Sequence, residues 1–383
     1  MGARQRPAEY GDSFNMKIIV FFGHHKVGST ALQDFFSKNF QSLLDKKILY
    51  PMVDFQGLSL MLAKCATLRP ESDDVRLPIN AREAHNALAF KMIEEHRNSP
   101  VPPFHTHLPH TSQMFHAIRC QINAINPDHV VLISEVMANF GTITSSFFQR
   151  LKKEFPRAEF QFIATIRRVD EYLMSWHSQR LRFGHKLAPL DQGGLETYFD
   201  GIHFNYQRMI KPWIDAFPEA NFVIRNHADV MMNGGSIEDF KVQSGLIYPD
   251  NMKPPSIANP SYHRATFELA RRANKDLPPE SAVKARNFLE LITPALELPK
   301  SSQIELIGEK ARLEMYDRFA PIHDFLGTTI RSGPFFSDFE KVRECQPIHY
   351  SEATEVILPQ LGKHLPILRD EVARNFFQKN LTQ

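Results

Sequence analysis

The sequence predicts an α/β protein with a central parallel β-sheet flanked by helices, followed by a C-terminal helical region. Short runs rich in Ile, Val and Phe, such as 18–22, recur between stretches with a helical spacing of apolar residues. Uninterrupted apolar runs of strand length are typical of strands buried in a parallel sheet. From Tyr248 onward several prolines interrupt the chain and the apolar spacing becomes helical, which predicts the C-terminal region.

The expected strands alternate with helices, as a parallel sheet requires. The strands are expected at 18–22, 48–51, 129–135, 159–166 and 221–225. Helices are expected at 29–36, 55–65, 81–97, 112–125, 141–155, 206–217 and 236–245, and further on at 261–275, 280–292, 301–326 and 367–377. The length suits one large domain with an appendage. We therefore expect a flexible polar arm at 1–15, an α/β nucleotide-binding core at 16–247, and a helical cap with a tail at 248–383, packed on the core.

The composition is that of a soluble globular protein, with 43% hydrophobic and 23% charged residues. The net charge of +2 indicates no broad surface for polyanions, so we expect no nucleic-acid partner. Cys65, Cys120 and Cys345 fit no zinc pattern and favour a reducing compartment, so a cytoplasmic protein is expected. No apolar run approaches the ~18 residues that a transmembrane segment needs. The oligomeric state is left open.

The stretch with the most information joins the first strand to the first helix. It is a loop with two glycines, made of Gly23, His24, His25, Lys26, Val27, Gly28, Ser29 and Thr30. Such a loop at a helix N-terminus binds anions, because backbone N–H groups converge there and the helix dipole favours negative charge. Lys26 adds a positive charge, and Ser29 or Thr30 can cap the helix. The alternative is a strand–loop–helix unit that binds nothing.

Gly23 and Gly28 have the glycine spacing of the Walker A loop, G-x-x-x-x-G-K-[ST]. The lysine of that motif is missing, because Ser29 follows Gly28 and the lysine lies two residues before it. A nucleotide kinase or NTPase would also need a carboxylate for Mg²⁺. Such an enzyme stays an alternative, as does a non-catalytic nucleotide-binding protein with the same fold.

Two further strands end in residues that suit proton transfer or anion binding. Ser134 and Glu135 follow the third strand, and ligands of open α/β sheets bind at the carboxyl ends of strands. Glu135 is therefore a candidate general base, and the alternative is that it caps the next helix. Arg167 ends the fourth strand, and Ser175 lies about two turns into the following helix. An arginine can bind a phosphate through two N–H groups, and a serine hydroxyl can add another hydrogen bond.

These motifs resemble those of the sulfotransferases that use 3′-phosphoadenosine-5′-phosphosulfate (PAPS). GHHKVGSTALQ at 23–33 is similar to the 5′-phosphosulfate loop of bacterial members, in which a Tyr-Pro pair follows, here at 50–51. The spacing of Arg167 and Ser175 resembles the 3′-phosphate motif of the family. The chain departs from these motifs at three positions. Val27 stands where Thr is usual, Arg168 where Asp or Asn is usual, and Val169 where Pro is usual.

The resemblance implies a P-loop-type three-layer fold and transfer of a sulfuryl group from PAPS to a hydroxyl or amine, without a metal. The loop at 23–30 would hold the 5′-phosphosulfate, and Arg167 with Ser175 the 3′-phosphate. Charge builds up on the oxygen that bridges sulfur and phosphorus, where Lys26 is placed to neutralise it. A carboxylate or a loop histidine would take the acceptor's proton. The candidate catalytic residues are Lys26, Glu135 and His25.

The acceptor is expected to be a carbohydrate or another glycan-like or lipid molecule, on the same resemblance. Inserted loops near a phosphate site often form the acceptor pocket. We therefore expect acceptor contacts from His105, His107 and His185. The first two could instead form a metal site with His110, but no cysteine or acidic cluster accompanies them, so solvated loop histidines are favoured.

Overall fold

The computed structural model describes residues 16–66, 77–256, 262–330 and 333–381. The polar arm expected at 1–15 lies outside this part of the chain. Contacts divide the described residues into two compact units. The first unit runs to Ile166 and resumes from Met209 to 256, and the second consists of Arg167–Arg208 and the residues from 262 onward. Residues 167–208, which were expected within the 16–247 core, fall in the second unit, and their helix packs against helices of the C-terminal region.

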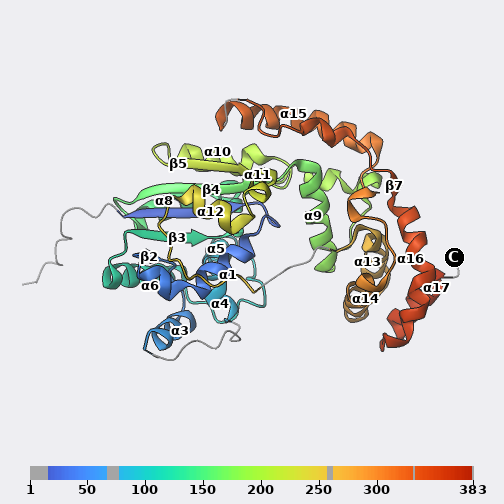
Figure 1. Cartoon of the computed structure of the whole chain (residues 1–383), viewed down its shortest axis with the longest axis horizontal. Coiled ribbons are helices and arrows are strands. Elements are labelled where there is room, and N and C mark those ends of the chain that lie inside the picture. Colours follow the sequence, from blue (N-terminus) through green and yellow to red (C-terminus); the bar gives the residue numbers. More distant parts are fainter. Residues whose placement is uncertain (1–15, 67–76, 257–261, 331–332, 382–383) are drawn as a thin grey trace, which may run out of the picture. The chain divides into compact units, whose positions relative to one another are not determined.

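The first unit contains a five-stranded parallel sheet in the order β2-β3-β1-β4-β5, which confirms the predicted α/β class (Figure 1). All of its strands begin and end within a few residues of the expected ranges. They are β1 (Lys17–Gly23), β2 (Ile48–Leu49), β3 (His129–Ile133), β4 (Glu159–Ile166) and β5 (Asn221–Asn226). β1 lies in the centre of the sheet, and its residues from Ile18 to Phe22 are buried.

The helices of the first unit follow the expected pattern with two breaks. They are α1 (Ser29–Lys38), α2 (Phe40–Leu44), α3 (Phe55–Ala66), α4 (Ile79–Arg82), α5 (Ala84–Arg97), α6 (Thr111–Ile125), α7 (Phe140–Ile143), α8 (Ser146–Glu154), α10 (Tyr206–Ala216), α11 (His227–Met232) and α12 (Ser236–Ser244). The first break is at Glu83, where a φ of −110° and a ψ of 43° interrupt the helix expected at 81–97. The continuous helix expected at 141–155 is also wrong. Thr144 is extended, and its hydroxyl accepts a hydrogen bond from the N–H of Ser146, where a new helix begins.

Helices cover both faces of the sheet. Successive side chains of a strand point to opposite faces, so one strand contacts helices on both sides. Phe21 of β1 contacts Phe240 of α12, with ring centroids 6.1 Å apart. Phe22 stacks on Trp213 of α10 at 4.8 Å, and Trp213 also contacts Phe148 of α8. This aromatic packing fixes the strand that leads into the glycine-containing loop.

The second unit is helical, as predicted for the C-terminal region. Its elements are α9 (Val169–Arg182), α13 (Phe267–Asp276), α14 (Pro279–Ile292), α15 (Glu309–Thr329), α16 (Tyr350–His364), α17 (Glu371–Leu381), and a two-stranded parallel sheet of β6 (Ile304–Glu305) and β7 (Ile348–His349). α9 packs against α13 and α15. No helix in the described ranges of either unit is long and apolar enough to cross a membrane.

The single helix expected at 301–326 is wrong, because the chain turns before α15. Gly308 has a φ of +79°, which a residue with a Cβ rarely adopts. The carboxylate of Glu305 accepts hydrogen bonds from the N–H groups of Ile307 and Gly308, at 2.8 and 3.0 Å. The turn therefore separates the short strand β6 from the long helix.

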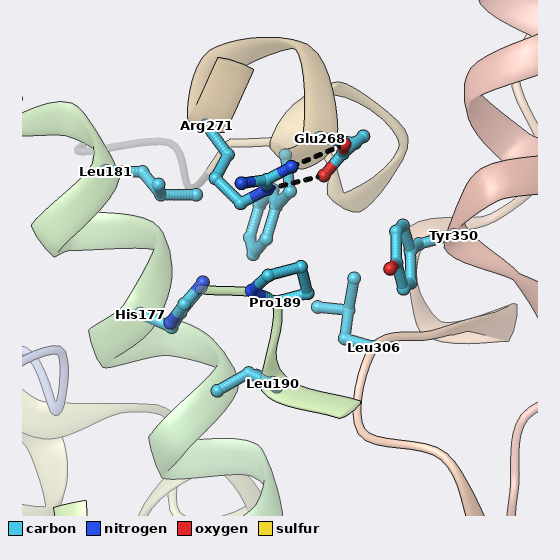
Figure 2. A pocket seen from close by; sticks show the side chains of 9 residues that line it. His177, Leu181, Pro189, Leu190, Glu268, Arg271, Leu306 and Tyr350 are labelled. Atoms are coloured by element: carbon cyan, nitrogen blue, oxygen red, sulfur yellow. Dashed lines mark hydrogen bonds and ion pairs between the residues drawn. The ribbon is translucent and has the colours of Figure 1, made fainter. Parts of the chain in front are cut away.

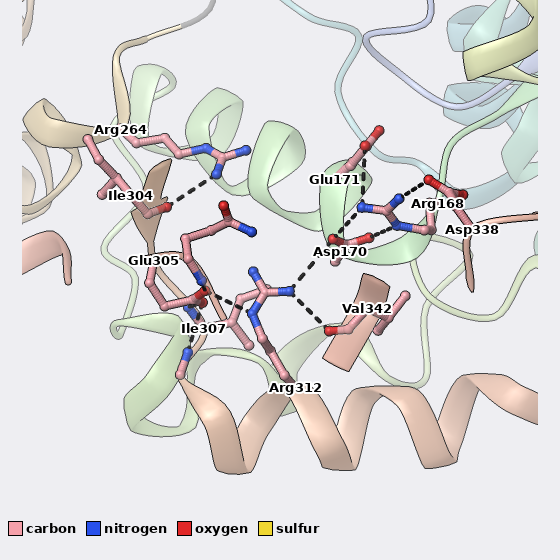
Figure 3. Close-up of polar contacts among 12 residues, drawn as sticks. Arg168, Asp170, Glu171, Arg264, Ile304, Glu305, Ile307, Arg312, Asp338 and Val342 are labelled. Atoms are coloured by element: carbon pink, nitrogen blue, oxygen red, sulfur yellow. Dashed lines mark hydrogen bonds and ion pairs between the residues drawn. The ribbon is translucent and has the colours of Figure 1, made fainter. Parts of the chain in front are cut away.

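A buried network of charged side chains joins segments of the second unit (Figure 3). Arg312 of α15 is fully buried, with its Nε 2.9 Å from Oε2 of Glu305 and its Nη1 3.7 Å from Oδ2 of Asp170. Burial by itself would raise the pKa of Glu305, but hydrogen bonds from backbone N–H groups and the charge of Arg312 outweigh it and lower the pKa. A buried charge is tolerated only when it is paired and hydrogen-bonded in this way. The network thus ties α9, β6 and α15 together.

Candidate functional site

The loop that follows β1 requires glycine near both of its ends. Gly23 has a φ of +144°, and a Cβ there would lie 2.6 Å from the carbonyl oxygen of Thr165 on β4. Gly28 has a φ of +91°, and a Cβ there would lie 2.4 Å from the Oγ of Ser236. The same neighbours hold the loop. The N–H of His24 donates to the Thr165 carbonyl at 3.2 Å, and the Ser236 hydroxyl donates to the Gly28 carbonyl at 3.3 Å.

Lys26 adopts a left-handed backbone conformation in the middle of this loop, with a φ of +62°. This conformation costs a residue with a Cβ about 1–2 kcal/mol. Strained backbone of this kind concentrates at functional sites. Lys26 and His25 are partly exposed, whereas His24 and Val27 are buried. Among the non-glycine residues of the loop at 23–30, Lys26 is the one with this conformation.

The start of α1 keeps the properties of an anion site. Gly28 is the N-cap, so the expectation that Ser29 or Thr30 caps the helix is wrong. Within the described residues no side chain caps α1, and the first backbone N–H groups of a helix have no partner inside it. These donors and the helix dipole attract anions. Val27 is only 1% exposed, so a ligand could contact its backbone but not its side chain.

Glu135 lies at the same edge of the sheet as the loop. β1 and β3 run parallel with Phe21 beside Ile133, so both strands end together. The Glu135 side chain is 13% exposed, and its Oε1 lies 3.9 Å from Nδ1 of His25. The same oxygen accepts a hydrogen bond from Nδ2 of Asn86 at 3.3 Å. The structure thus brings together two of the predicted catalytic residues, His25 and Glu135.

The surroundings of Glu135 favour its protonated form. Burial raises the pKa of this carboxyl, and the negative charge of Glu83 raises it further. Hydrogen bonds from its own backbone, from Ser29 and from Asn86 act in the opposite direction, and the net effect is a raised pKa. A carboxylate with a raised pKa is a stronger base, which suits general base catalysis.

His25 is a neutral imidazole at pH 7. Burial and the positive charge of Lys26 lower its pKa to about 4. Its contact with Glu135 is therefore no ion pair at this pH, and 3.9 Å is too long for a hydrogen bond. A neutral imidazole can accept a proton, so both residues are candidates for the general base.

The start of α5 brings residues to the site that no motif indicated. Asn86 lies in its first turn, and Nδ2 of Asn86 is 3.3 Å from a carboxylate oxygen of Glu83 as well as from Glu135. His85 anchors α5 to β3, because its Nδ1 accepts a hydrogen bond from the N–H of Ile133 at 3.0 Å. In the sequence only the three-residue spacing of Glu83 and Asn86, which places them near one helix face, could have indicated them. That spacing is too common to identify a site.

Arg167 and Ser175, which were expected to bind the 3′-phosphate, belong to the second unit. Ser175 is a half-buried residue of α9. Arg167 precedes α9, and its Nη2 lies 3.7 Å from a carboxylate oxygen of Glu171. Arg168, at the position where the resembling motif has Asp or Asn, is buried with its Nε 2.7 Å from Oδ1 of Asp170. This arginine therefore has a structural role in the second unit.

The histidines expected to contact the acceptor have different environments. His105 is only 4% exposed, its Nδ1 lies 2.9 Å from Oδ1 of Asn80, and burial lowers its pKa. His107 is exposed, with a φ of +57°. His185 is exposed and lies in the second unit. Across the described part of the chain, no group of three or more His, Cys, Asp or Glu side chains is arranged to hold a metal ion.

The second unit has a small, mostly apolar pocket (Figure 2). Its walls are formed by His177, Leu181, Pro189, Leu190, Phe267, Glu268, Arg271, Leu306 and Tyr350. Nε of Arg271 lies 2.7 Å from a carboxylate oxygen of Glu268, and Nδ1 of His177 lies 2.9 Å from the Tyr198 hydroxyl. The polar groups are therefore engaged with the protein.

Comparisons with known proteins do not identify a family for this chain. No family model matches it, and no solved structure matches it. A stretch of 132 residues is 26% identical to an uncharacterized protein of Archaeoglobus fulgidus. The match covers 34% of this chain and 35% of that protein, so the two are similar over about a third of their lengths.

Proposed function

We propose that this protein is a sulfotransferase with a P-loop-type fold, which transfers a sulfuryl group from PAPS to a hydroxyl or an amine of an acceptor. The observation that carries the proposal is the strained loop with Lys26 at the uncapped start of α1. A mostly buried carboxylate, Glu135, lies beside the same loop and has a raised pKa. Anion binding and proton removal are the two tasks that this reaction requires.

In the proposed reaction the acceptor oxygen attacks the sulfur atom in line with the bond to the bridging oxygen. A new S–O bond forms while the bond between sulfur and the bridging oxygen breaks, so the electron pair leaves with adenosine 3′,5′-bisphosphate. Lys26 and the backbone N–H groups at the start of α1 would stabilise this charge. Glu135, or the neutral His25, would take the proton that the acceptor loses.

The remaining assignments of the proposal rest on the sequence motifs. Arg167 and Ser175 would bind the 3′-phosphate of PAPS. The acceptor would be a carbohydrate, another glycan-like molecule or a lipid. His107 and His185 are exposed and would be able to contact it, whereas the buried His105 would shape its loop.

The test is the thermal unfolding of the protein with adenosine 3′,5′-bisphosphate, compared with ATP and Mg²⁺. At 100 times its dissociation constant a ligand stabilises by about 2.7 kcal/mol. For a unit of this size that corresponds to a rise in Tm of about 5–10 °C. The expected result is a rise with the bisphosphate alone, which Lys26→Ala and Arg167→Ala reduce and which Lys46→Ala, an exposed control, leaves unchanged.

Two results would overturn the proposal. A rise with ATP and Mg²⁺ alone would indicate a nucleotide kinase or NTPase. A protein that responds to neither nucleotide would have no PAPS site.

A further inference from the structure

Asn86 holds two carboxylates with one amide group. Its Nδ2 lies 3.3 Å from Oε2 of Glu83 and 3.3 Å from Oε1 of Glu135, so each of its two N–H bonds can reach one carboxylate. Its Oδ1 accepts a hydrogen bond from the hydroxyl of Ser134 at 2.8 Å. If the amide were flipped, its oxygen would face two carboxylates, and oxygen atoms that only accept hydrogen bonds repel each other. The neighbours of Asn86 therefore fix its orientation.

Glu83 is itself held in place. Its Oε1 lies 2.7 Å from Nη2 of Arg82, and the carbonyl of Arg82 accepts a hydrogen bond from the buried Tyr50 hydroxyl at 2.9 Å. The side chains of Glu83 and Glu135 are both 13% exposed. Little water is available there to screen one carboxylate from the other.

On the basis of the proposed function, we propose that Glu83 is a positioning residue that acts on Glu135 through the Asn86 amide. Glu83 orients Asn86, and Asn86 holds Oε1 of Glu135. Oε2 of Glu135 is buried with no hydrogen-bond partner among the described residues, so it is the oxygen on which the proton of the protonated form can lie. The charge of Glu83 also favours the protonated form of Glu135, because two like charges repel across the shared amide.

Among the ionisable groups around Glu135, Glu83 is the one whose charge mainly raises the pKa of Glu135. His25 is neutral at pH 7, since its pKa is about 4. Burial raises the pKa of Tyr50 well above its usual value, so this residue is neutral too. Arg82 is ion-paired with Glu83. The groups that face Glu135 or its neighbours are Glu83 and Arg82 before α5, His25 and Lys26 in the loop, and Tyr50 after β2.

The test measures the protonation of Glu135 directly, by carbon NMR of the full chain labelled at the glutamate carboxyls. The Glu135 signal is identified by its loss in Glu135→Gln. Glu83→Gln keeps the shape and an acceptor oxygen but removes the charge, so the titration midpoint of Glu135 is expected to fall by on the order of one pH unit. Glu94→Gln, which lies further along α5 and is paired with Lys91, is the control and should leave the midpoint unchanged.

A second variant tests the amide itself. Asn86→Ala removes a hydrogen bond to the charged form of Glu135, so the midpoint is expected to rise, opposite to the effect of Glu83→Gln. An unchanged midpoint in Glu83→Gln, or a shift no larger than in Glu94→Gln, would overturn the proposal. If Glu83→Gln does not fold, an unchanged or lowered midpoint in Asn86→Ala would overturn it.

Binding of the bisphosphate to the same samples separates this inference from the proposed function. If the unchanged protein binds the bisphosphate but Glu83→Gln leaves the midpoint where it was, only the role of Glu83 is wrong. If the unchanged protein does not bind the bisphosphate, the proposed function fails, and with it any role of Glu83 in sulfuryl transfer.

Discussion

Replacing Lys26 by Gly is expected to leave the protein more stable than replacing it by Ala. Lys26 has a φ of +62°, and this left-handed conformation costs a residue with a Cβ about 1–2 kcal/mol. Glycine avoids this cost but loses about 0.5–1 kcal/mol more conformational entropy than alanine on folding. The balance favours Lys26→Gly over Lys26→Ala by about 0.5–1 kcal/mol.

Thermal unfolding of the two variants under identical conditions measures this difference. It corresponds to a Tm higher by about 1–4 °C for Lys26→Gly, given the size of the first unit. The matched control is Lys91 in the middle of α5, where glycine should be less stable than alanine by about 1 kcal/mol. The sign of the glycine–alanine difference is therefore expected to reverse between the two positions.

The same variants separate backbone strain from the role of the positive charge. Both Lys26 variants lose the ammonium group, so both should bind the bisphosphate more weakly than the unchanged protein, although their stabilities differ. A Lys26→Ala protein as stable as Lys26→Gly would refute the argument from strain. Full bisphosphate affinity in both variants would refute the role given to the charge.

Two further predictions concern buried ionisable groups. Burial lowers the pKa of His85 to about 3 in the folded protein, whereas in the unfolded chain it is ~6.5. The unfolded chain therefore binds this proton first as the pH drops, and the free energy of unfolding is lower by about 2 kcal/mol at pH 5. His85→Gln should remove this part of the pH dependence in unfolding by urea, and an unchanged dependence would contradict the assignment. Arg312→Met leaves Glu305 buried without its partner and should lower stability by about 3–5 kcal/mol. Arg318→Met, which breaks an exposed ion pair, should cost under about 0.5 kcal/mol, and equal losses would show that the network in Figure 3 contributes little.

The fold class could be predicted from sequence because strand and turn signals are local. The apolar run before Gly23 is buried in the centre of the sheet, and Gly28 lies where the chain needs a positive φ. The break at Thr144 could not be predicted, because the apolar spacing continues across it. The turn at Gly308 could not be predicted for a similar reason, because hydrophobic residues lie on both sides of it and no sequence signal marks the end of β6.

The candidate site was predicted only in part, because its members come from distant segments. Asn86 and Glu135 are 49 residues apart and meet only when α5 packs at the end of β3. Gly28 is held by Ser236, which is 208 residues away. Arg168 pairs with Asp338, which is 170 residues away, as well as with the nearby Asp170, and no local pattern indicates the distant partner.

The sequence by itself determined the strand–loop–helix unit around Lys26. Its signals are a short apolar run, two spaced glycines and a helix start, and each of them is contained within a few consecutive residues. It also placed a carboxylate, Glu135, after a neighbouring strand. The tertiary structure alone decided the strand order, the strained backbone of Lys26 and the shared amide between Glu83 and Glu135. Packing sets these features, because burial and the approach of distant charges exist only after the segments have come together.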